Sequence, residues 1–222
     1  MRRQVYCISA LGADERIFGR LQWQDCELHF LSWIAPEINE TMEAYARRMC
    51  AQIRHEHPIL IGVSFGGMMC IEIAKIIETD RVILISSIKT KDELPAWLKL
   101  VAVLNLHRFI PILSWQYFSG LKIFDSIENY FLGAGDDAEK QLAMEFRHNI
   151  DPAFLRWSID HILNWNNRWA PPGVSHIHGT SDRIFPVTRV RVSHRVRGAG
   201  HFMVYSHAGE VSDTLNQLMR GE

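Results

Sequence analysis

The stretch Pro58-Ile59-Leu60-Ile61-Gly62-Val63-Ser64-Phe65-Gly66-Gly67 decides how this 222-residue chain is expected to fold. Its apolar start indicates a buried strand, and its glycines indicate a tight turn around a serine. The apolar residues that follow indicate a buried helix over residues 65–77. A strand that turns into a helix around G-x-S-x-G is typical of a nucleophile elbow, which holds its serine exposed and strained. The stretch therefore predicts that Ser64 is a nucleophile.

A serine hydroxyl is a weak nucleophile that needs a general base, and the base needs an acidic partner to orient it. Two later segments supply candidates. Asp182 follows a predicted strand over residues 174–178, and His201 follows a predicted strand over residues 191–197. Each candidate therefore lies in a loop after a strand, and the chain order is serine, aspartate, histidine.

Three motifs carry a resemblance to a known family: Gly62–Gly67, His178-Gly179-Thr180-Ser181-Asp182 and Gly198-Ala199-Gly200-His201. They resemble the motifs of small, esterase-like serine hydrolases of the α/β-hydrolase fold superfamily. Together with the order of strands and helices, the resemblance covers nearly the whole chain except about residues 89–150.

The resemblance implies that Ser64 is the nucleophile, His201 the general base and Asp182 its partner, and that no cofactor is required. It also implies an oxyanion hole built from the backbone N–H groups of Phe65 and Leu11. If Asp182 is not the acid, the loop after the strand that ends at Ser87 is the next place to look.

The loop after the first predicted strand departs from the family pattern. Ser9-Ala10 stands where many relatives have His-Gly, but the required donor is a backbone group and does not depend on the side chain. Gly12 is the alternative to Leu11 as that donor. Asp14 is expected to cap a helix over residues 15–21. Arg16 is open to two interpretations, a structural ion pair, which we favour, or a partner for a substrate carboxylate.

The pattern alternates strand and helix, which predicts one α/β domain over residues 1–222 with a mainly parallel sheet covered by helices on both faces. The antiparallel N-terminal edge strands of larger relatives are expected to be missing. Strands are predicted at 4–9, 27–32, 58–63, 81–87, 174–178 and 191–197, and helices at 15–21, 41–53, 65–77, from 151, and at 209–218.

Residues 89–150 are too long for a simple connection and are rich in apolar side chains. We expect them to form a helical cap over the active site, inserted between the strand that ends near residue 87 and the helix that starts near residue 151. Four aromatic residues are candidates for a substrate pocket, although each could instead pack the cap onto the core. They are Trp115, Phe118, Phe131 and Phe202.

The composition of the chain indicates which partners and which cellular compartment to expect. The net charge of −1 does not favour nucleic acid, and no segment has the roughly 18 apolar residues of a membrane span. Of four cysteines, Cys7 and Cys70 lie in apolar runs, and none forms a C-x-x-C motif. The N-terminus lacks the apolar core of a signal peptide. We therefore expect a cytoplasmic protein in a reducing compartment, although an even number of cysteines leaves disulfides possible.

Four arginines and two pairs of histidines could suggest a binding site, but we expect them to have structural roles. Arg189, Arg191, Arg195 and Arg197 alternate and would share one solvated face of an edge strand. The pairs His176/His178 and His55/His57 lack the spacing of a known zinc motif. No metal site is predicted, and His178 is expected to orient the loop of the acid.

The sequence thus predicts a serine hydrolase that cleaves an ester bond of a small molecule through an acyl-enzyme. An acyltransferase or thioesterase would use the same three residues, and a small-molecule receptor of the same fold is a non-enzymatic alternative. Acyl chain length, leaving group and oligomeric state are left open.

Overall fold

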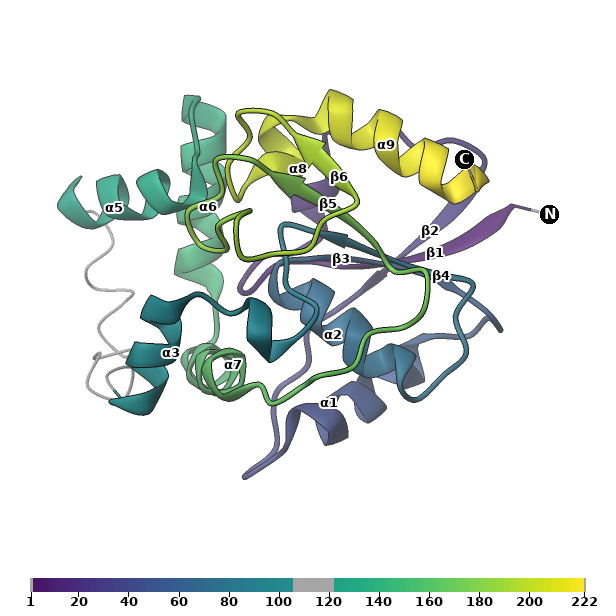
Figure 1. Ribbon diagram of the computed structural model, residues 1–222, viewed down its shortest axis with the longest axis horizontal. Coiled ribbons are helices and arrows are strands. Elements are labelled where there is room, and N and C mark those ends of the chain that lie inside the picture. Colours follow the sequence, from purple (N-terminus) through teal and green to yellow (C-terminus); the bar gives the residue numbers. More distant parts are fainter. Residues whose placement is uncertain (1, 106–121, 222) are drawn as a thin grey trace.

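The computed structural model describes residues 2–105 and 122–221. Its centre is a six-stranded sheet in the order β2-β1-β3-β4-β5-β6, and every neighbouring pair is parallel. Helices cover both faces (Figure 1). This is the predicted α/β architecture. The strands are β1 (Arg3–Ile8), β2 (Cys26–Leu31), β3 (Ile59–Val63), β4 (Arg81–Ile85), β5 (Ser175–Gly179) and β6 (His194–Val196).

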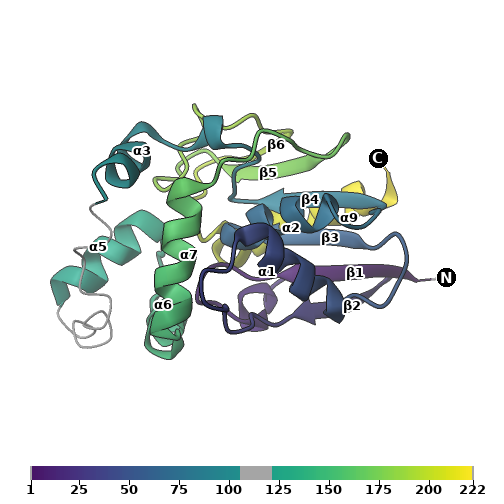
Figure 2. The same cartoon turned by 90° about the horizontal axis from the view of Figure 1, so that it is seen from below.

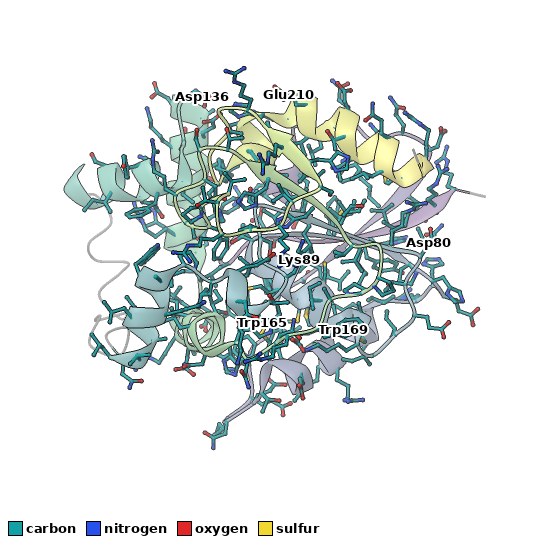
Figure 3. The ribbon with its side chains drawn as sticks, viewed as in Figure 1. Asp80, Lys89, Asp136, Trp165, Trp169 and Glu210 are labelled. Atoms are coloured by element: carbon teal, nitrogen blue, oxygen red, sulfur yellow. The ribbon has the colours of Figure 1, made fainter. Side chains whose placement is uncertain are left out.

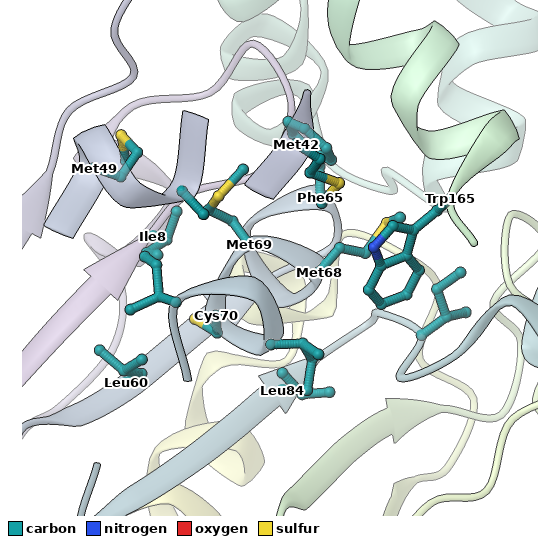
Figure 4. Packing of buried hydrophobic residues seen from close by; sticks show 14 of the residues in the cluster. Ile8, Met42, Met49, Leu60, Phe65, Met68, Met69, Cys70, Leu84 and Trp165 are labelled. Atoms are coloured by element: carbon teal, nitrogen blue, oxygen red, sulfur yellow. The ribbon is translucent and has the colours of Figure 1, made fainter. Parts of the chain in front are cut away.

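The strands divide the core into two hydrophobic clusters because successive side chains point to opposite faces. In β1, Tyr6 and Ile8 belong to the first cluster, while Val5 and Cys7 belong to the second. Figure 4 shows the first cluster between the sheet and α2, where Met68 lies beside Trp165. Such burial on both faces is expected when helices cover both sides of a parallel sheet.

Different helices cover the two clusters. Helices α1, α2 and α7 supply the first cluster, and η1, α6, α8 and α9 supply the second. The bounds are η1 (Glu15–Phe18), α1 (Met42–Met49), η2 (Cys50–Gln52), α2 (Phe65–Ala74), η3 (Lys91–Glu93), α3 (Ala96–Val103), α5 (Lys122–Leu132), α6 (Asp137–Asn149), α7 (Pro152–Asn164), α8 (Met203–Ser206) and α9 (Ala208–Arg220).

Side-chain caps begin several helices where the sequence predicts them. The Thr41 hydroxyl accepts from Ala44 N at the start of α1, and the Asp151 carboxylate accepts from Phe154 N at 2.8 Å at the start of α7. Asp14 caps η1 as expected, but that element is a single 3₁₀ turn instead of a helix over residues 15–21. The chain leaves η1 at Gly19.

A buried carboxylate links the end of α7 to α2. Trp165 follows α7, and its indole donates to Glu72 Oε1 at 2.7 Å, while Lys75 Nζ lies 2.7 Å from the same oxygen. Figure 3 labels Trp165 beside α7. These two donors compensate for burying Glu72, because an unpaired carboxylate in the core would be costly.

The predicted strand over residues 191–197 is the main error in the secondary structure. Only His194–Val196 form β6. Ahead of β6, Arg191 N donates to Glu93 Oε1 at 2.9 Å, and Lys89 Nζ donates to the Arg191 carbonyl; Lys89 is labelled in Figure 3. The backbone of Arg191 therefore bonds to side chains and not to β5. The four arginines of this region are exposed, as expected, but they do not lie on one strand.

Helices α3, α5 and α6 occupy the chain between β4 and α7 and lie beyond the carboxyl ends of the strands (Figure 2). Helix α6 buries Leu142 and Phe146 in the second core cluster. The end of α5 contacts the loop that carries His201, because Phe202 N donates to Leu132 O at 2.9 Å. Part of this segment therefore packs as core, and part lies beside the predicted site.

Cys7, Cys26, Cys50 and Cys70 are free thiols, and Cys7 and Cys70, which lie in apolar runs, are buried. Burial raises the pKa of both buried thiols, so they stay protonated at neutral pH. Within residues 2–105 and 122–221, no helix is both long and apolar enough to cross a membrane.

Candidate active site

Ser64 lies at the junction of β3 and α2 with a backbone φ of +53°, a left-handed value that is strained for a residue other than glycine. The neighbouring glycines permit this turn. A Cβ on Gly62 would lie 2.4 Å from Gly66 O, and a Cβ on Gly66 would lie 2.4 Å from the carbonyl oxygens of Ile8 and Ser9. The elbow therefore presses directly against the end of β1.

The structure brings the three predicted residues together in one hydrogen-bonded chain. His201 Nε2 lies 2.9 Å from Ser64 Oγ, and His201 Nδ1 lies 2.8 Å from Asp182 Oδ2. Because the carboxylate can only accept, Nδ1 carries the hydrogen and Nε2 is free to accept from the serine hydroxyl. Asp182 and His201 are buried, and Ser64 is half-buried.

The Asp182 carboxylate is held on both oxygens. Oδ1 accepts from the backbone N–H groups of Ile184 and Phe185, both at 2.9 Å, and Oδ2 faces His201. Burial raises the pKa of Asp182, but His201 and His178 and the hydrogen bonds of the loop outweigh burial and hold the pKa below its usual value. The acid is therefore ionised at neutral pH.

His178 lies where the sequence suggested, beside the loop of the acid. Its Nε2 is 3.4 Å from Asp182 Oδ2 and 2.7 Å from the Phe185 carbonyl oxygen. His176 Nε2 lies 3.2 Å from His178 Nδ1. In the part of the chain that the structure describes, no set of three or more histidine, cysteine, aspartate or glutamate side chains is arranged to hold a metal ion.

The predicted oxyanion loop is tightly organised. Ala13 N donates to Ala10 O at 3.0 Å and closes a turn around Leu11. Ser9 Oγ donates to Ala13 O at 2.6 Å and accepts from Trp33 Nε1 at 3.0 Å. The amide of Phe65, at the first position of α2, has no acceptor within the helix and is free for an anion. The loop that carries Leu11 begins beside the elbow, because Gly66 packs against the carbonyls of Ile8 and Ser9.

Sequence reasoning missed Trp33. Its ring stacks on the ring of Phe65 with centroids 5.2 Å apart, and its indole donates to Ser9 Oγ in the predicted oxyanion loop. Trp33 and Phe154 also line a cavity of about 460 Å³ beside that loop, together with Gly12, Phe18, Phe30 and Ile150. The signal available in the sequence was an aromatic residue directly after the strand next to β1.

The predicted pocket aromatics have different environments. Phe131, near the end of α5, is partly exposed and packs against Trp97 of α3, with ring centroids 6.1 Å apart. Phe202 is buried in the second core cluster and packs against Tyr205. Trp115 and Phe118 lie outside the described residues.

Arg16 forms ion pairs with Asp14 and Glu145, at 2.9 and 2.7 Å, which supports the interpretation as a structural ion pair. Another arginine joins the site to the helices above it. Arg183, next to Asp182, donates to the Tyr130 carbonyl at 2.6 Å and lies 4.1 Å from the centre of the Tyr130 ring. The loop of the acid is thereby attached to α5.

The arrangement provides the parts that acyl transfer needs. It has a strained serine, an imidazole within hydrogen-bonding distance, an ionised carboxylate that orients the imidazole, and candidate N–H donors at a helix start.

Solved structures share this fold at low sequence identity. An esterase from Thermogutta terrifontis is 14% identical, with a TM-score of 0.75, and the alignment covers 99% of this chain and 90% of the esterase. A putative lipase from Acinetobacter baumannii AYE is 13% identical, with a TM-score of 0.69 and coverage of 99% and 84%. A meta-cleavage product hydrolase from Pseudomonas fluorescens IP01 is 15% identical, with a TM-score of 0.67 and coverage of 99% and 91%.

No curated protein sequence matches the chain significantly. The sequence model of the Alpha/beta hydrolase family, in contrast, matches residues 2–214. That match covers the elbow, the acid, the histidine and every strand of the sheet. The chain therefore belongs to the alpha/beta hydrolase family.

Proposed function

We propose that this hydrolase cleaves an ester bond of a small molecule through an acyl-enzyme. The observation that carries the proposal is the hydrogen-bonded chain from Ser64 Oγ through His201 to Asp182, with contacts of 2.9 and 2.8 Å. The likeness to an esterase and a lipase supports an ester substrate. Membership of the family supports hydrolysis.

In the proposed reaction, Ser64 Oγ attacks the ester carbonyl carbon while His201 Nε2 takes the hydroxyl proton. The tetrahedral intermediate collapses, the bond to the leaving oxygen breaks, and His201 gives its proton to that oxygen. A water molecule then attacks the acyl-enzyme and gives a proton to His201. Collapse of the second intermediate releases the acid, and the proton returns to Ser64.

We assign the developing oxyanion to the backbone N–H groups of Phe65 and Leu11. Such a donor typically contributes about 3 kcal/mol to transition-state stabilisation. The hydrogen bonds of Ser9 and Trp33 support this role because they fix the loop before any substrate binds. The cavity beside the loop is the place that we propose for an apolar part of the substrate, and Phe131 is a second candidate contact.

Two alternatives remain within the proposal. An acyltransferase or thioesterase would use the same acyl-enzyme with a different acceptor or leaving group. A panel of esters assayed with competing alcohol, amine and thiol acceptors separates these reactions. A non-enzymatic receptor would bind the small molecule without turnover.

Labelling with a fluorophosphonate and mapping of the modified peptide tests the proposal. We expect the label on Ser64, and no label on folded Ser64→Ala protein. We also expect 4-nitrophenyl acetate to be hydrolysed by the wild type and not by Ser64→Ala. Labelling of another residue, or folded wild-type protein that neither labels nor turns over any ester, would contradict a serine hydrolase.

A further inference from the structure

The hydrogen-bond partners of His178 define which of its ring nitrogens carries a hydrogen. Nε2 lies 2.7 Å from the Phe185 carbonyl oxygen, which can only accept, so Nε2 must be the donor. The opposite tautomer would direct a nitrogen lone pair at this oxygen and at Asp182 Oδ2, 3.4 Å away. Burial lowers the pKa of His178, so the ring is neutral and Nδ1 has a lone pair.

His176 completes the arrangement from the same strand. Its Nε2 lies 3.2 Å from His178 Nδ1, and the two rings meet edge to face with centroids 5.0 Å apart. Because His178 Nδ1 accepts, His176 Nε2 is the donor. The remaining nitrogen, His176 Nδ1, is buried.

Phe185 contacts His178 and also both Asp182 and His201. Its carbonyl accepts from His178, its N–H donates to Asp182 Oδ1 at 2.9 Å, and its ring meets the His201 ring edge to face with centroids 5.6 Å apart. One residue therefore connects His178 to both. The Phe185 carbonyl and N–H belong to adjacent peptide groups joined at the Phe185 Cα, so loss of the donor to the carbonyl would loosen the backbone from which the N–H reaches the Asp182 carboxylate.

We propose that His178, kept in the neutral Nε2–H tautomer by His176, is a positioning residue that holds Asp182 in line with His201. This inference rests on the proposed function of Asp182 and His201. His178 does not touch the reacting atoms, and it acts through Phe185 and the Asp182 carboxylate. A displacement of about 1 Å in such a group can cost up to about a hundredfold in rate.

The tautomers can be tested without any assay of activity. A long-range ¹H–¹⁵N spectrum of the histidine side chains, recorded on the wild type at pH 7, reports which ring nitrogen is protonated. We expect both His176 and His178 to be neutral with hydrogen on Nε2. Substitution of each histidine by glutamine assigns the signals. Hydrogen on Nδ1 of His178 would overturn the proposal.

Two amide variants test the positioning role with matched chemistry. Glutamine at 178 can place its NH₂ group near the position of Nε2, whereas asparagine is too short to reach the Phe185 carbonyl. We expect His178→Gln to keep kcat within a few-fold of the wild type. We expect His178→Asn to lose about ten- to a hundredfold in both kcat and kcat/KM, with KM unchanged. His194→Asn, on the neighbouring strand β6, is the control for histidine removal.

Wild-type rates in folded His178→Asn, or a loss that appears only in KM, would overturn the proposal. A further readout separates its failure from that of the proposed function. The hydrogen bond between His201 Nδ1 and Asp182 gives a strongly downfield proton signal, which we expect in the wild type and His178→Gln but not in His178→Asn. If the wild type shows the signal but hydrolyses no ester, the proposed function fails and the positioning role stands. If His178→Asn does not fold, the wild-type tautomers decide the proposal.

Discussion

The hydroxyl of Ser87 donates a 2.6 Å hydrogen bond to the carbonyl oxygen of Ser64. The segment directly after β4 therefore fixes the turn that carries the proposed nucleophile. A Cβ on Gly67 would lie 2.5 Å from Ser87 Oγ, so the first turn of α2 closes tightly over this contact. Sequence analysis pointed to the loop after Ser87 only as another place for the acid, whereas the structure gives Ser87 a contact with the backbone of the elbow.

We expect Ser87→Ala to lower both stability and activity. Loss of a buried hydrogen bond costs about 1 kcal/mol, and the Ser64 carbonyl would keep only its bonds from the N–H groups of Gly67 and Met68, which should loosen the elbow. Urea unfolding and kcat for 4-nitrophenyl acetate measure the two effects. Ser158→Ala is a matched control, because the buried Ser158 hydroxyl has no hydrogen-bond partner among the described residues. Equal effects of the two substitutions would contradict a specific role for Ser87.

Ser64→Gly should be more stable than Ser64→Ala, although neither variant should hydrolyse esters. The φ of +53° at this position strains any residue that has a Cβ, and glycine avoids a cost of about 1 kcal/mol. Thermal melting of the two variants under the same conditions tests this expectation. If alanine is as stable as glycine, the elbow carries no measurable backbone strain.

Asp182→Asn should lower kcat by about four orders of magnitude, because the imidazole loses the partner that fixes its tautomer. The pKa of Asp182 is lowered in the folded protein, so its ionised form stabilises the fold above the ordinary carboxyl pKa near 4. That stabilisation is lost as the pH falls through the lowered pKa. In urea unfolding, the advantage of the wild type over the variant should therefore be largest at neutral pH and should shrink in acid. If the difference in unfolding free energy between the two proteins were the same at pH 7 and pH 3, ionised Asp182 would not stabilise the fold.

Phe131→Ala should change the preference among acyl chain lengths more than it changes kcat for acetate. Phe131 is partly exposed, and Leu132 beside it binds the backbone of the histidine loop at Phe202. Val103→Ala serves as the control, because Val103 is also in this segment and is strongly exposed. The measurement is kcat/KM over a series of 4-nitrophenyl esters. A uniform loss over all esters would indicate a folding defect and not selectivity.

The carboxyl group of Glu128 should make stability depend on pH near neutrality. Burial raises its pKa to about 7, although Arg147 Nη1 lies 2.7 Å from Oε2 and opposes this. The ordinary pKa of a glutamate is about 4.3. Between that pH and about pH 7, the Glu128 carboxyl is protonated more in the folded protein than in the unfolded chain, so the free energy of unfolding falls as the pH rises. The melting temperature of Glu128→Gln minus that of the wild type should therefore increase from pH 5 to pH 8. The opposite trend would show that the ion pair with Arg147 outweighs burial.

The fold was predictable because its signals are local. The strands around Ser64 have uninterrupted apolar runs, and the caps at Thr41 and Asp151 use residue types whose side chains accept from the first turn of a helix. The residues of the proposed triad were predictable for a related reason. Parallel strands carry their loops to one edge of the sheet, so residues that follow three strands meet there.

What could not be predicted depends on contacts between distant segments. The extent of β6 is set by Glu93 and Lys89, which bind the backbone of Arg191 about a hundred positions away, and no local pattern records such a contact. The support of the oxyanion loop by Trp33 is of the same kind. Even the tautomer of His178 depends on the Phe185 carbonyl, which only the folded loop brings into reach.

The contact between Ser64 and His201 joins residues 137 positions apart in the chain. A ribosome makes the chain from its N-terminus, at about 5–20 residues per second. Ser64 and the β strands around it therefore leave the ribosome several seconds before His201 does. During that interval the nascent chain displays a serine that has no base, and the hydroxyl remains chemically inert. The proposed nucleophile and its proposed base can therefore meet only after the chain has been made as far as His201.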